Sequence, residues 1–189
     1  MEALLSHRCA GLFGYSHLTA CIAWHAMELG EVKQEQTIDI WGCGSGGFIF
    51  IMWAKLQDVK RIIAIDYIPK RLRKARELDG PDVFIYATGF RYTKETLHKV
   101  EGLLRLETDA TSAIIEAIYL VKKFGHISLI GDYYGLTNHF PIGALFDKGI
   151  TFRAGVVCVQ KYWKLLLQYI LDGKVDLTKI ITHTILIIK

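Results

Sequence analysis

Blocks of apolar residues recur along the chain, and their lengths predict strands and helices in alternation. Short runs rich in β-branched residues are typical of buried strands, whereas longer runs are typical of helices. The predicted strands span residues 37–41, 61–66, 82–89, 126–132 and 150–157. The predicted helices span residues 47–57, 69–78, 108–125 and 162–174, with a short turn at 144–148. This order predicts a doubly wound α/β fold, in which helices cover both faces of a parallel sheet and the crossovers are right-handed.

Residues at the ends of two predicted helices agree with this fold. Pro69 falls in the first turn of the 69–78 helix, where a missing N–H is tolerated. The 108–125 helix has Thr108 or Asp109 as its expected N-cap and Gly125 as its expected C-cap. No repeat or linker interrupts the sequence, and 189 residues suffice for one domain with a sizeable core.

The first predicted strand runs into a glycine-rich turn, "DIWGCGSGGF" at 39–48, where Gly42, Gly44 and Gly47 form the pattern G-x-G-x-x-G. Alone this pattern is weak evidence, because a chain with 17 glycines can produce it by chance. Here it lies between a strand and a helix, and a second strand follows, as in a dinucleotide-binding βαβ unit. Gly42 would allow the tight turn, Gly44 the approach of a pyrophosphate, and Gly47 close helix packing. The helix N-terminus would favour an anion at the same place.

Asp66 lies 19 residues after Gly47, at the carboxyl end of the second predicted strand. A carboxylate there can accept hydrogen bonds from an adenosine ribose, and it would repel a 2′-phosphate, which favours NAD over NADP. Nearby cations weaken this preference: Lys70, Arg71, Arg73 and Lys74. The alternative interpretation is a plain strand-to-helix turn, with Asp66 capping the next helix.

The amino-acid composition limits the kinds of partner that the chain is expected to bind. Hydrophobic residues make up 51% and charged residues 22% of the chain, which is typical of a globular domain. The apolar run 48–54 is too short to span a bilayer, and the N-terminus lacks the features of a signal peptide. The net charge is +4, and the basic cluster at 70–76 is more typical of a solvated helix face than of a nucleic-acid site. We therefore expect neither a nucleic-acid nor a membrane partner.

The cysteines indicate the compartment. Cys9, Cys21, Cys43 and Cys158 show no C-x-x-C pairing and no repeated spacing. Isolated thiols of this kind are typical of a reduced, cytoplasmic protein. We expect a cytoplasmic location.

Six blocks are spread in chain order over nearly the whole sequence, between residues 11 and 183: "GLFGYSHLT", "WHAMELGEVKQEQTIDIWGCGSGGF", "IIAIDYIPKRLRKARE", "GPDVFIYATGFRY", "IGDYYGLTNHFPIGALFDKGITFRAG" and "QKYWKLLLQYILDGKVDLTKIITH". Together they resemble the zinc-dependent medium-chain alcohol dehydrogenases. They are most similar to the branch of glutathione-independent formaldehyde dehydrogenases and their fungal relatives. The ordered series is far more specific than the glycine pattern alone, and it implies a Rossmann NAD(P)-binding fold.

The resemblance implies a cofactor site made of Gly42, Gly44, Ser45, Gly46, Gly47, Asp66 and Arg71. The glycines fall on the family's pyrophosphate loop and Asp66 on its ribose-binding acid. Arg71 belongs to the pattern D-x-x-P-x-R-L and would lie along the adenosine. Ser45 and Gly46 stand where the family usually has Pro-Val, which keeps the backbone donors and loosens the start of the helix.

The family uses a zinc ion to hold the alcohol or aldehyde oxygen beside the nicotinamide. The resemblance implies that the zinc ligands belong to a catalytic domain before residue 37. Residues 1–36 are therefore expected to be a remnant of that domain's border, and residues 37–189 the dinucleotide-binding domain. The sequence has neither a Cys-x-His zinc motif nor a four-cysteine cluster, so no bound zinc is expected.

Several histidines are candidate metal ligands. His7, Cys9 and His17 could form a residual zinc site, but zinc needs ligands that converge, and surface residues are the simpler interpretation. His25 and His183 are expected to be structural histidines.

Two further expectations concern the sheet. After the 69–78 helix, Asp79 and Gly80 lead straight into a block that resembles the family's fourth strand, so the third strand is expected to be missing and the order to be 2-1-4-5-6. The segment "GITFRAGVV" at 149–157 resembles the family's edge strand, which pairs with its twin, so a homodimer is expected. The alternative is that the 162–174 helix covers this edge.

Three functional hypotheses follow. The chain is an NAD-binding domain without independent catalysis, or an active oxidoreductase with a partner-supplied or rebuilt site, or a non-enzymatic interaction protein that uses its sheet edge. Fold alone does not choose among them.

Overall fold

The computed structural model describes residues 7–65, 80–87, 112–131, 133 and 135–177. The elements, in chain order, are α1 (His7–Leu29), β1 (Thr37–Trp41), α2 (Ser45–Leu56), β2 (Arg61–Ile65), β3 (Val83–Tyr86), α5 (Ser112–Leu120), β4 (His126–Leu129), α6 (Ile142–Lys148), β5 (Thr151–Ala154) and α7 (Val159–Leu171). The five strands form one sheet in the order β2-β1-β3-β4-β5, and every neighbouring pair is parallel.

This strand order confirms the predicted fold. β3 pairs directly with β1, on the side opposite β2, as expected if the family's third strand is missing. In the part of the chain that the structure describes, no strand lies outside β2. The sheet therefore has the predicted order 2-1-4-5-6 in the family's strand numbering.

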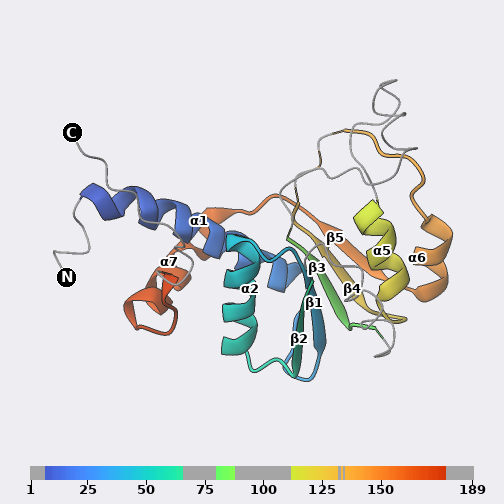
Figure 1. Ribbon diagram of the computed structural model, residues 1–189, viewed down its shortest axis with the longest axis horizontal. Helices are drawn as coiled ribbons and strands as arrows, with labels where there is room; N and C mark the ends of the chain where they lie inside the picture. Colours follow the sequence, from blue (N-terminus) through green and yellow to red (C-terminus); the bar gives the residue numbers. More distant parts are fainter. Residues whose placement is uncertain (1–6, 66–79, 88–111, 132, 134, 178–189) are drawn as a thin grey trace.

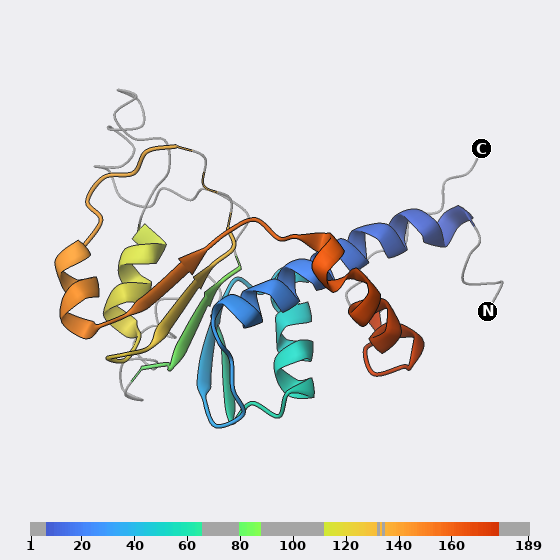
Figure 2. The same ribbon diagram turned by 180° about the vertical axis from the view of Figure 1, so that it is seen from behind.

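The sheet is the middle layer of three. Figures 1 and 2 show α1, α2 and α7 on one side of it, with α5 and α6 on the other. Ile38 and Ile40 of β1 point into the core under α1 and α2, whereas Trp41 belongs to the core under α5. Each core uses alternate residues because successive strand side chains point to opposite faces. Strands buried on both faces explain the continuous apolar runs in the sequence.

Trp53 joins the helices of the first layer. Its indole is fully buried and donates a hydrogen bond from Nε1 to the Ala20 carbonyl oxygen of α1, at 3.2 Å. The ring of Trp24 meets it edge-on, with 5.1 Å between ring centroids, and Tyr169 of α7 packs against both rings. These three aromatic side chains hold α1, α2 and α7 together as one layer on the sheet.

Several element ends differ from the predictions. Helix α2 begins at Ser45, not at residue 47, and α7 spans Val159–Leu171, not residues 162–174. The predicted turn at 144–148 is part of a longer helix, α6. This helix ends at Lys148, and its C-cap, Gly149, has a left-handed backbone conformation. Residues 69–78, Thr108 and Asp109 lie outside the described residues.

Gly125 was predicted to be the C-cap of the 108–125 helix, and this prediction is wrong. Helix α5 ends at Leu120, and the positive φ of the following turn (60°) belongs to Phe124. A Cβ at Gly125 would lie 2.8 Å from the Asp82 carbonyl oxygen and 2.7 Å from Val121 Cγ2. Close packing, not a left-handed cap, therefore explains glycine at this position.

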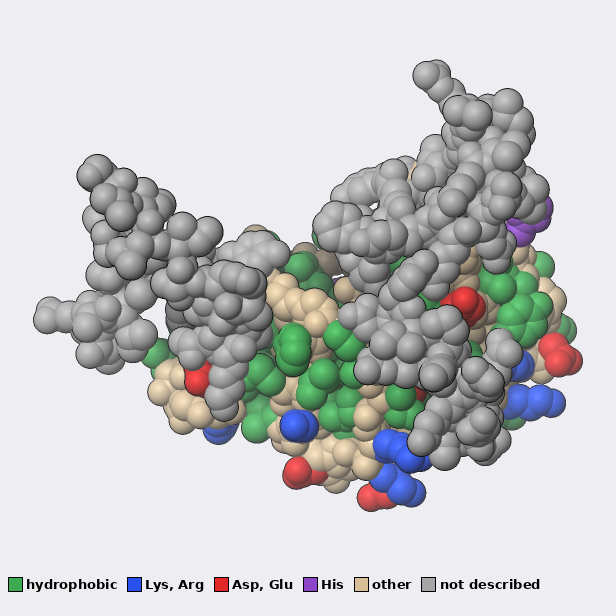
Figure 3. All heavy atoms as spheres, viewed as in Figure 1, with side chains coloured by type: hydrophobic (Ala, Val, Ile, Leu, Met, Phe, Trp, Pro, Cys, Tyr) green, Lys and Arg blue, Asp and Glu red, His purple; other side chains and the backbone are tan. Residues whose placement is uncertain are grey.

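We expect Trp53→Ala to destabilise the protein by about 3–5 kcal/mol, because it removes a fully buried indole and its hydrogen bond to α1. Phe48→Ala is the matched control on the same helix, since the Phe48 side chain is 53% exposed. Figure 3 shows that hydrophobic side chains also lie on the surface of this face of the molecule. The control should change stability by about 0.5 kcal/mol or less. Urea unfolding of both variants tests this, and equal losses would contradict the role given to Trp53.

Candidate functional site

The turn after β1 depends on a conformation that suits glycine. Gly42 has φ of 108°, in the region that residues with a side chain rarely adopt. Its N–H donates to the carbonyl oxygen of Ile65 at 2.8 Å, which ties the turn to the end of β2. The chain therefore leaves β1 sharply and re-enters the fold as α2.

Gly47 allows α2 to lie directly on this turn. A Cβ built at Gly47 would lie 1.9 Å from the carbonyl oxygen of Gly42, a distance that no real pair of atoms adopts. The contact is between two backbones, so any side chain at position 47 would push the first turn of α2 away from β1.

The N-terminus of α2 is open. Gly44 is the N-cap, and no side chain of the described part of the chain caps the helix. The first helical hydrogen bond runs from the N–H of Phe48 to the Gly44 carbonyl oxygen at 3.0 Å, so the N–H groups of residues 45–47 have no partner within the helix. A Cβ at Gly44 would meet no atom within 4 Å. The turn thus offers free backbone donors and the positive end of a helix dipole to an anion that can approach closely.

The turn lies where open α/β sheets bind ligands. It follows the carboxyl end of β1. The next strand along the chain, β2, lies on one side of β1, and the strand after that, β3, lies on the other side. Ligands of such sheets bind in the crevice at this switch point.

The structure brings together the five turn residues that the sequence predicted: Gly42, Gly44, Ser45, Gly46 and Gly47. Asp66 and Arg71, the predicted contacts of the adenosine half, lie outside the described residues. One neighbour was not predicted: Thr19 of α1 is 9% exposed, and its Cγ2 lies 4.0 Å from a Cβ built at Gly46. No local sequence signal marks Thr19, because the contact joins two helices.

The prediction that His17 is a surface residue is wrong. Its side chain is 2% exposed, and its ring lies 4.9 Å from that of Trp163 in α7. Burial lowers the pKa of His17, which favours the neutral ring. The side chains of His7 and Cys9 lie outside the described residues, as does His183.

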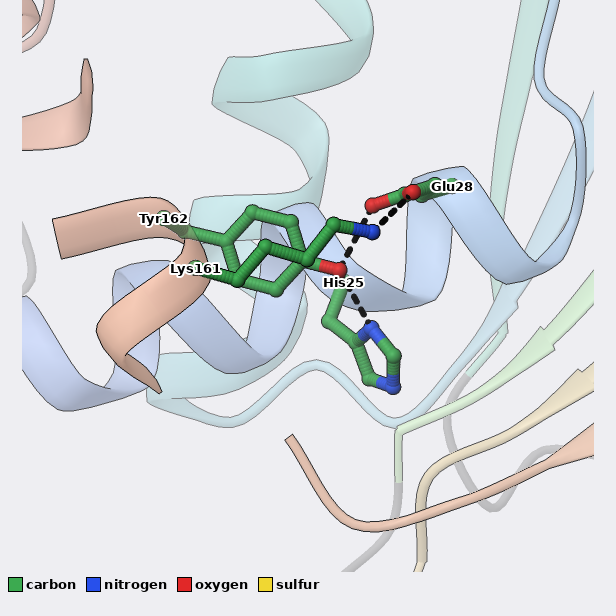
Figure 4. A network of polar contacts seen from close by, with 4 residues as sticks. All are labelled: His25, Glu28, Lys161 and Tyr162. Atoms are coloured by element: carbon green, nitrogen blue, oxygen red, sulfur yellow. Dashed lines mark hydrogen bonds and ion pairs between the residues drawn. The ribbon is translucent and has the colours of Figure 1, made fainter. Parts of the chain in front are cut away.

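His25 is a structural histidine, as predicted, and belongs to a polar network between α1 and α7 (Figure 4). The Tyr162 hydroxyl donates to Glu28 Oε2 at 2.5 Å and lies 2.7 Å from His25 Nδ1. Because the Tyr162 hydroxyl donates its hydrogen bond to Glu28, it accepts the hydrogen bond from His25. The proton of the neutral imidazole therefore lies on Nδ1. Lys161 pairs with the other Glu28 oxygen, and its hydrogen bond, together with that of Tyr162, lowers the pKa of Glu28.

Within the described ranges, no three His, Cys, Asp or Glu side chains lie close enough to hold a metal ion. The cysteines whose side chains are described, Cys21, Cys43 and Cys158, are not joined in a disulfide. Among the described helices none is long and apolar enough to cross a membrane.

Curated proteins match most of the chain. A zinc-type alcohol dehydrogenase-like protein of Schizosaccharomyces pombe is 35% identical over 188 residues, covering 87% of this chain and 44% of that protein. The zinc-type alcohol dehydrogenase-like protein AdhB of Bacillus subtilis is 27% identical over 177 residues, covering 82% of this chain and 47% of that protein. The chain therefore spans about half the length of the curated relatives it matches. No protein-family model matches it.

Solved structures match the fold. The alcohol dehydrogenase TADH from Thermus sp. ATN1 superposes with a TM-score of 0.67 at 22% identity, covering 87% of this chain and 49% of that one. An alcohol dehydrogenase from Escherichia coli CFT073 complexed with NADH gives a TM-score of 0.59 at 19% identity, covering 86% and 48%. A zinc-binding dehydrogenase from Sinorhizobium meliloti 1021 bound to NADP gives a TM-score of 0.61 at 14% identity. This match covers 86% of this chain and 48% of that one.

The parallel sheet, its flanking helices and the glycine turn at its switch point define a Rossmann-like α/β domain. Over about half their length, zinc-type alcohol dehydrogenase-like proteins are similar in sequence to this chain.

Gly47→Ala should destabilise the chain by at least about 2 kcal/mol, because the added Cβ overlaps the Gly42 carbonyl oxygen. Gly44→Ala is the matched control, since the space around Gly44 is open and its φ of −71° suits alanine. The control should cost less than about 1 kcal/mol, the loss expected at an N-cap. Thermal unfolding of both variants measures the difference, and an equally stable Gly47→Ala protein would disprove the backbone contact.

Proposed function

We propose that the chain binds NAD(H) as the dinucleotide-binding domain of a zinc-type alcohol or aldehyde dehydrogenase, in the formaldehyde dehydrogenase-like branch. The observation that carries the proposal is the turn from Gly42 to Gly47, where a backbone contact fixes α2 and leaves its N-terminus open. In this proposal residues 37–189 form the cofactor domain, and residues 1–36 form the border of a catalytic domain.

The proposed pose uses backbone groups for the pyrophosphate. The N–H groups of Ser45, Gly46 and Gly47 would donate to its oxygens, and the absence of a side chain at Gly44 lets the phosphates approach. Asp66 would accept from the ribose hydroxyls, and Arg71 would lie along the adenosine. Among the structural neighbours one is complexed with NADH and another is bound to NADP; the acid at position 66 favours NAD here.

A bound nicotinamide would accept or deliver a hydride, and the residues of this chain would bind and orient it. The described residues do not fit a zinc site, since no three of their metal-ligating side chains converge. We therefore propose cofactor binding without independent catalysis. Two alternatives are an oxidoreductase whose reacting groups come from a partner or a rebuilt site, and a non-enzymatic protein that associates through its sheet edge.

We also propose a cytoplasmic homodimer that forms through β5. This strand is one edge of the sheet, and the N–H groups of Thr151 and Gly155 donate toward β4. Because strand N–H groups alternate in direction, those of Phe152 and Ala154 point outward, where a second copy could accept them. Helix α7 packs on α1, not over β5 (Figures 1 and 2), so it offers little support to the alternative of a covered edge. Free thiols support the cytoplasmic location.

The cofactor proposal predicts that Gly44→Val weakens NADH binding by at least about tenfold, or about 1.4 kcal/mol, because the side chain fills the pyrophosphate position. Gly143→Ala is the control, since Gly143 lies in α6 and is also in open space. Titration of NADH, followed by its fluorescence, measures both affinities. The turn is not the site if Gly44→Val binds as tightly as the parent, and a parent that binds no NADH would favour the interaction-protein hypothesis.

The dimer proposal predicts that Ala154→Pro shifts a dimer toward monomer, because proline removes an outward N–H from the edge strand. Ala154→Val retains this donor at the same exposed position and should remain dimeric. We prefer position 154 to Phe152, whose ring packs against Phe140 at 6.1 Å. Light scattering over a range of concentrations measures the mass, and a parent that stays monomeric at high concentration would refute the dimer.

A further inference from the structure

Asp39 is a carboxylate in the middle of the sheet. It is the third residue of β1 and 0% exposed, and in register it lies between Ile63 of β2 and Phe84 of β3. Its neighbours Ile38 and Ile40 point into the core under α1 and α2, so Asp39 points to the opposite face. Both of its carboxyl oxygens are buried, and neither has a hydrogen-bond partner among the residues that the structure describes.

An ionised carboxylate in these surroundings is strongly disfavoured. Water cannot reach the two oxygens, and the side chains beside it in the sheet are apolar. Burial raises the pKa of Asp39 from 3.8 to about 7, although the Arg61 guanidinium acts in the opposite direction. Arg61 is exposed and lies on β2 two residues before Ile63, the register partner of Asp39, so water screens its charge.

The other ionisable groups around Asp39 do not replace Arg61 as partners. Asp82, before β3, accepts the Thr37 N–H at 2.7 Å and pairs with Lys122 at 3.2 Å. On the same face, β3 carries Tyr86, and α5 carries Glu116 and the exposed Tyr119. Lys122 is thus already paired with Asp82, and none of the other groups named here carries a positive charge.

We propose that folding of this chain takes up one proton at Asp39, so that a neutral carboxylic acid holds the centre of β1 and the protein loses stability from acid toward neutral conditions. This inference goes beyond the proposed function, because it requires no cofactor. Its position links it to the site, since Gly42 begins the glycine turn three residues further along the chain, directly after β1 ends.

The direction of the pH dependence follows from linkage. The folded chain keeps the proton up to about pH 7, whereas the unfolded chain, with the ordinary value of 3.8, releases it earlier. The stability that Asp39 contributes is therefore full below 3.8, falls as the pH rises toward 7, and is lost above that value. Between these limits the unfolding equilibrium constant should rise about tenfold per pH unit through this one proton.

Urea unfolding of the parent and of Asp39→Asn at pH 5, 6, 7 and 8 tests the proposal. Asparagine has nearly the same shape and carries no charge at any of these values. Relative to the variant, the parent should lose about tenfold in folding equilibrium per pH unit from 5 to 7, and little more from 7 to 8. Asp58→Asn is the control, because Asp58 is exposed and its φ of 52° is tolerated by asparagine. The control should follow the pH profile of the parent, and parallel profiles for the parent and Asp39→Asn would overturn the proposal.

A second measurement does not depend on the variant folding. The carboxyl carbon of Asp39 in the parent, followed by NMR with pH, should titrate with a midpoint near 7. A midpoint below about 5, close to the ordinary range of aspartate, would show a carboxylate that is already ionised and would overturn the proposal.

Discussion

The contact between Gly47 and the carbonyl oxygen of Gly42 fixes the position of α2, and the rest of the site depends on that position. Without a side chain between them, the first turn of α2 rests on the backbone that leaves β1. The helix N-terminus is thereby placed at the switch point of the sheet, the place where ligands of such sheets bind. The hydrogen bond from Gly42 to Ile65 closes the same unit against β2.

The helix layer keeps α2 in this place. Trp53 binds the Ala20 carbonyl oxygen of α1, and Thr19, one residue earlier, lies beside Gly46 in the turn. Helix α7 is joined to α1 by the aromatic contact of Tyr169 with Trp24 and by the polar network around Glu28. The glycine turn is therefore supported from both sides, by the sheet and by a helix that comes from the N-terminal part of the chain.

The sequence predicted the sheet well because parallel strands are buried on both faces. The central strands β1 and β3 are largely apolar and buried, and the first of them, Thr37–Trp41, has the predicted bounds. The glycine turn was predictable for a related reason, since its geometry requires glycine at positions 42 and 47 whatever the rest of the fold does. Local chemistry determines these features, so local patterns reveal them.

Features that depend on packing between distant elements were not predictable in this way. The 23-residue helix α1 has apolar residues distributed around its axis and no periodic pattern that marks one face. The burial of His17 depends on Trp163, and the glycine at position 125 depends on the Asp82 carbonyl oxygen, each of which is remote in sequence. Asp39 passed unnoticed for the opposite reason, because one acid within an apolar strand does not disturb the pattern that predicts the strand.

The proposed cofactor site and a metal site differ in the same way, since the first is formed by residues close in sequence and the second requires residues from distant segments. The proposed pyrophosphate site is formed within one contiguous βαβ unit, residues 37–65, supported by α1, so a chain half as long as its relatives can contain it whole. A metal site requires ligands that converge from several segments, and the described residues provide no such set. The same unit also carries Asp39, whose burial opposes ionisation in the strand that leads into the turn. The glycine turn and Asp39 thus lie within the same 29 residues, 37–65, and substitutions at either can be studied in the chain as it stands.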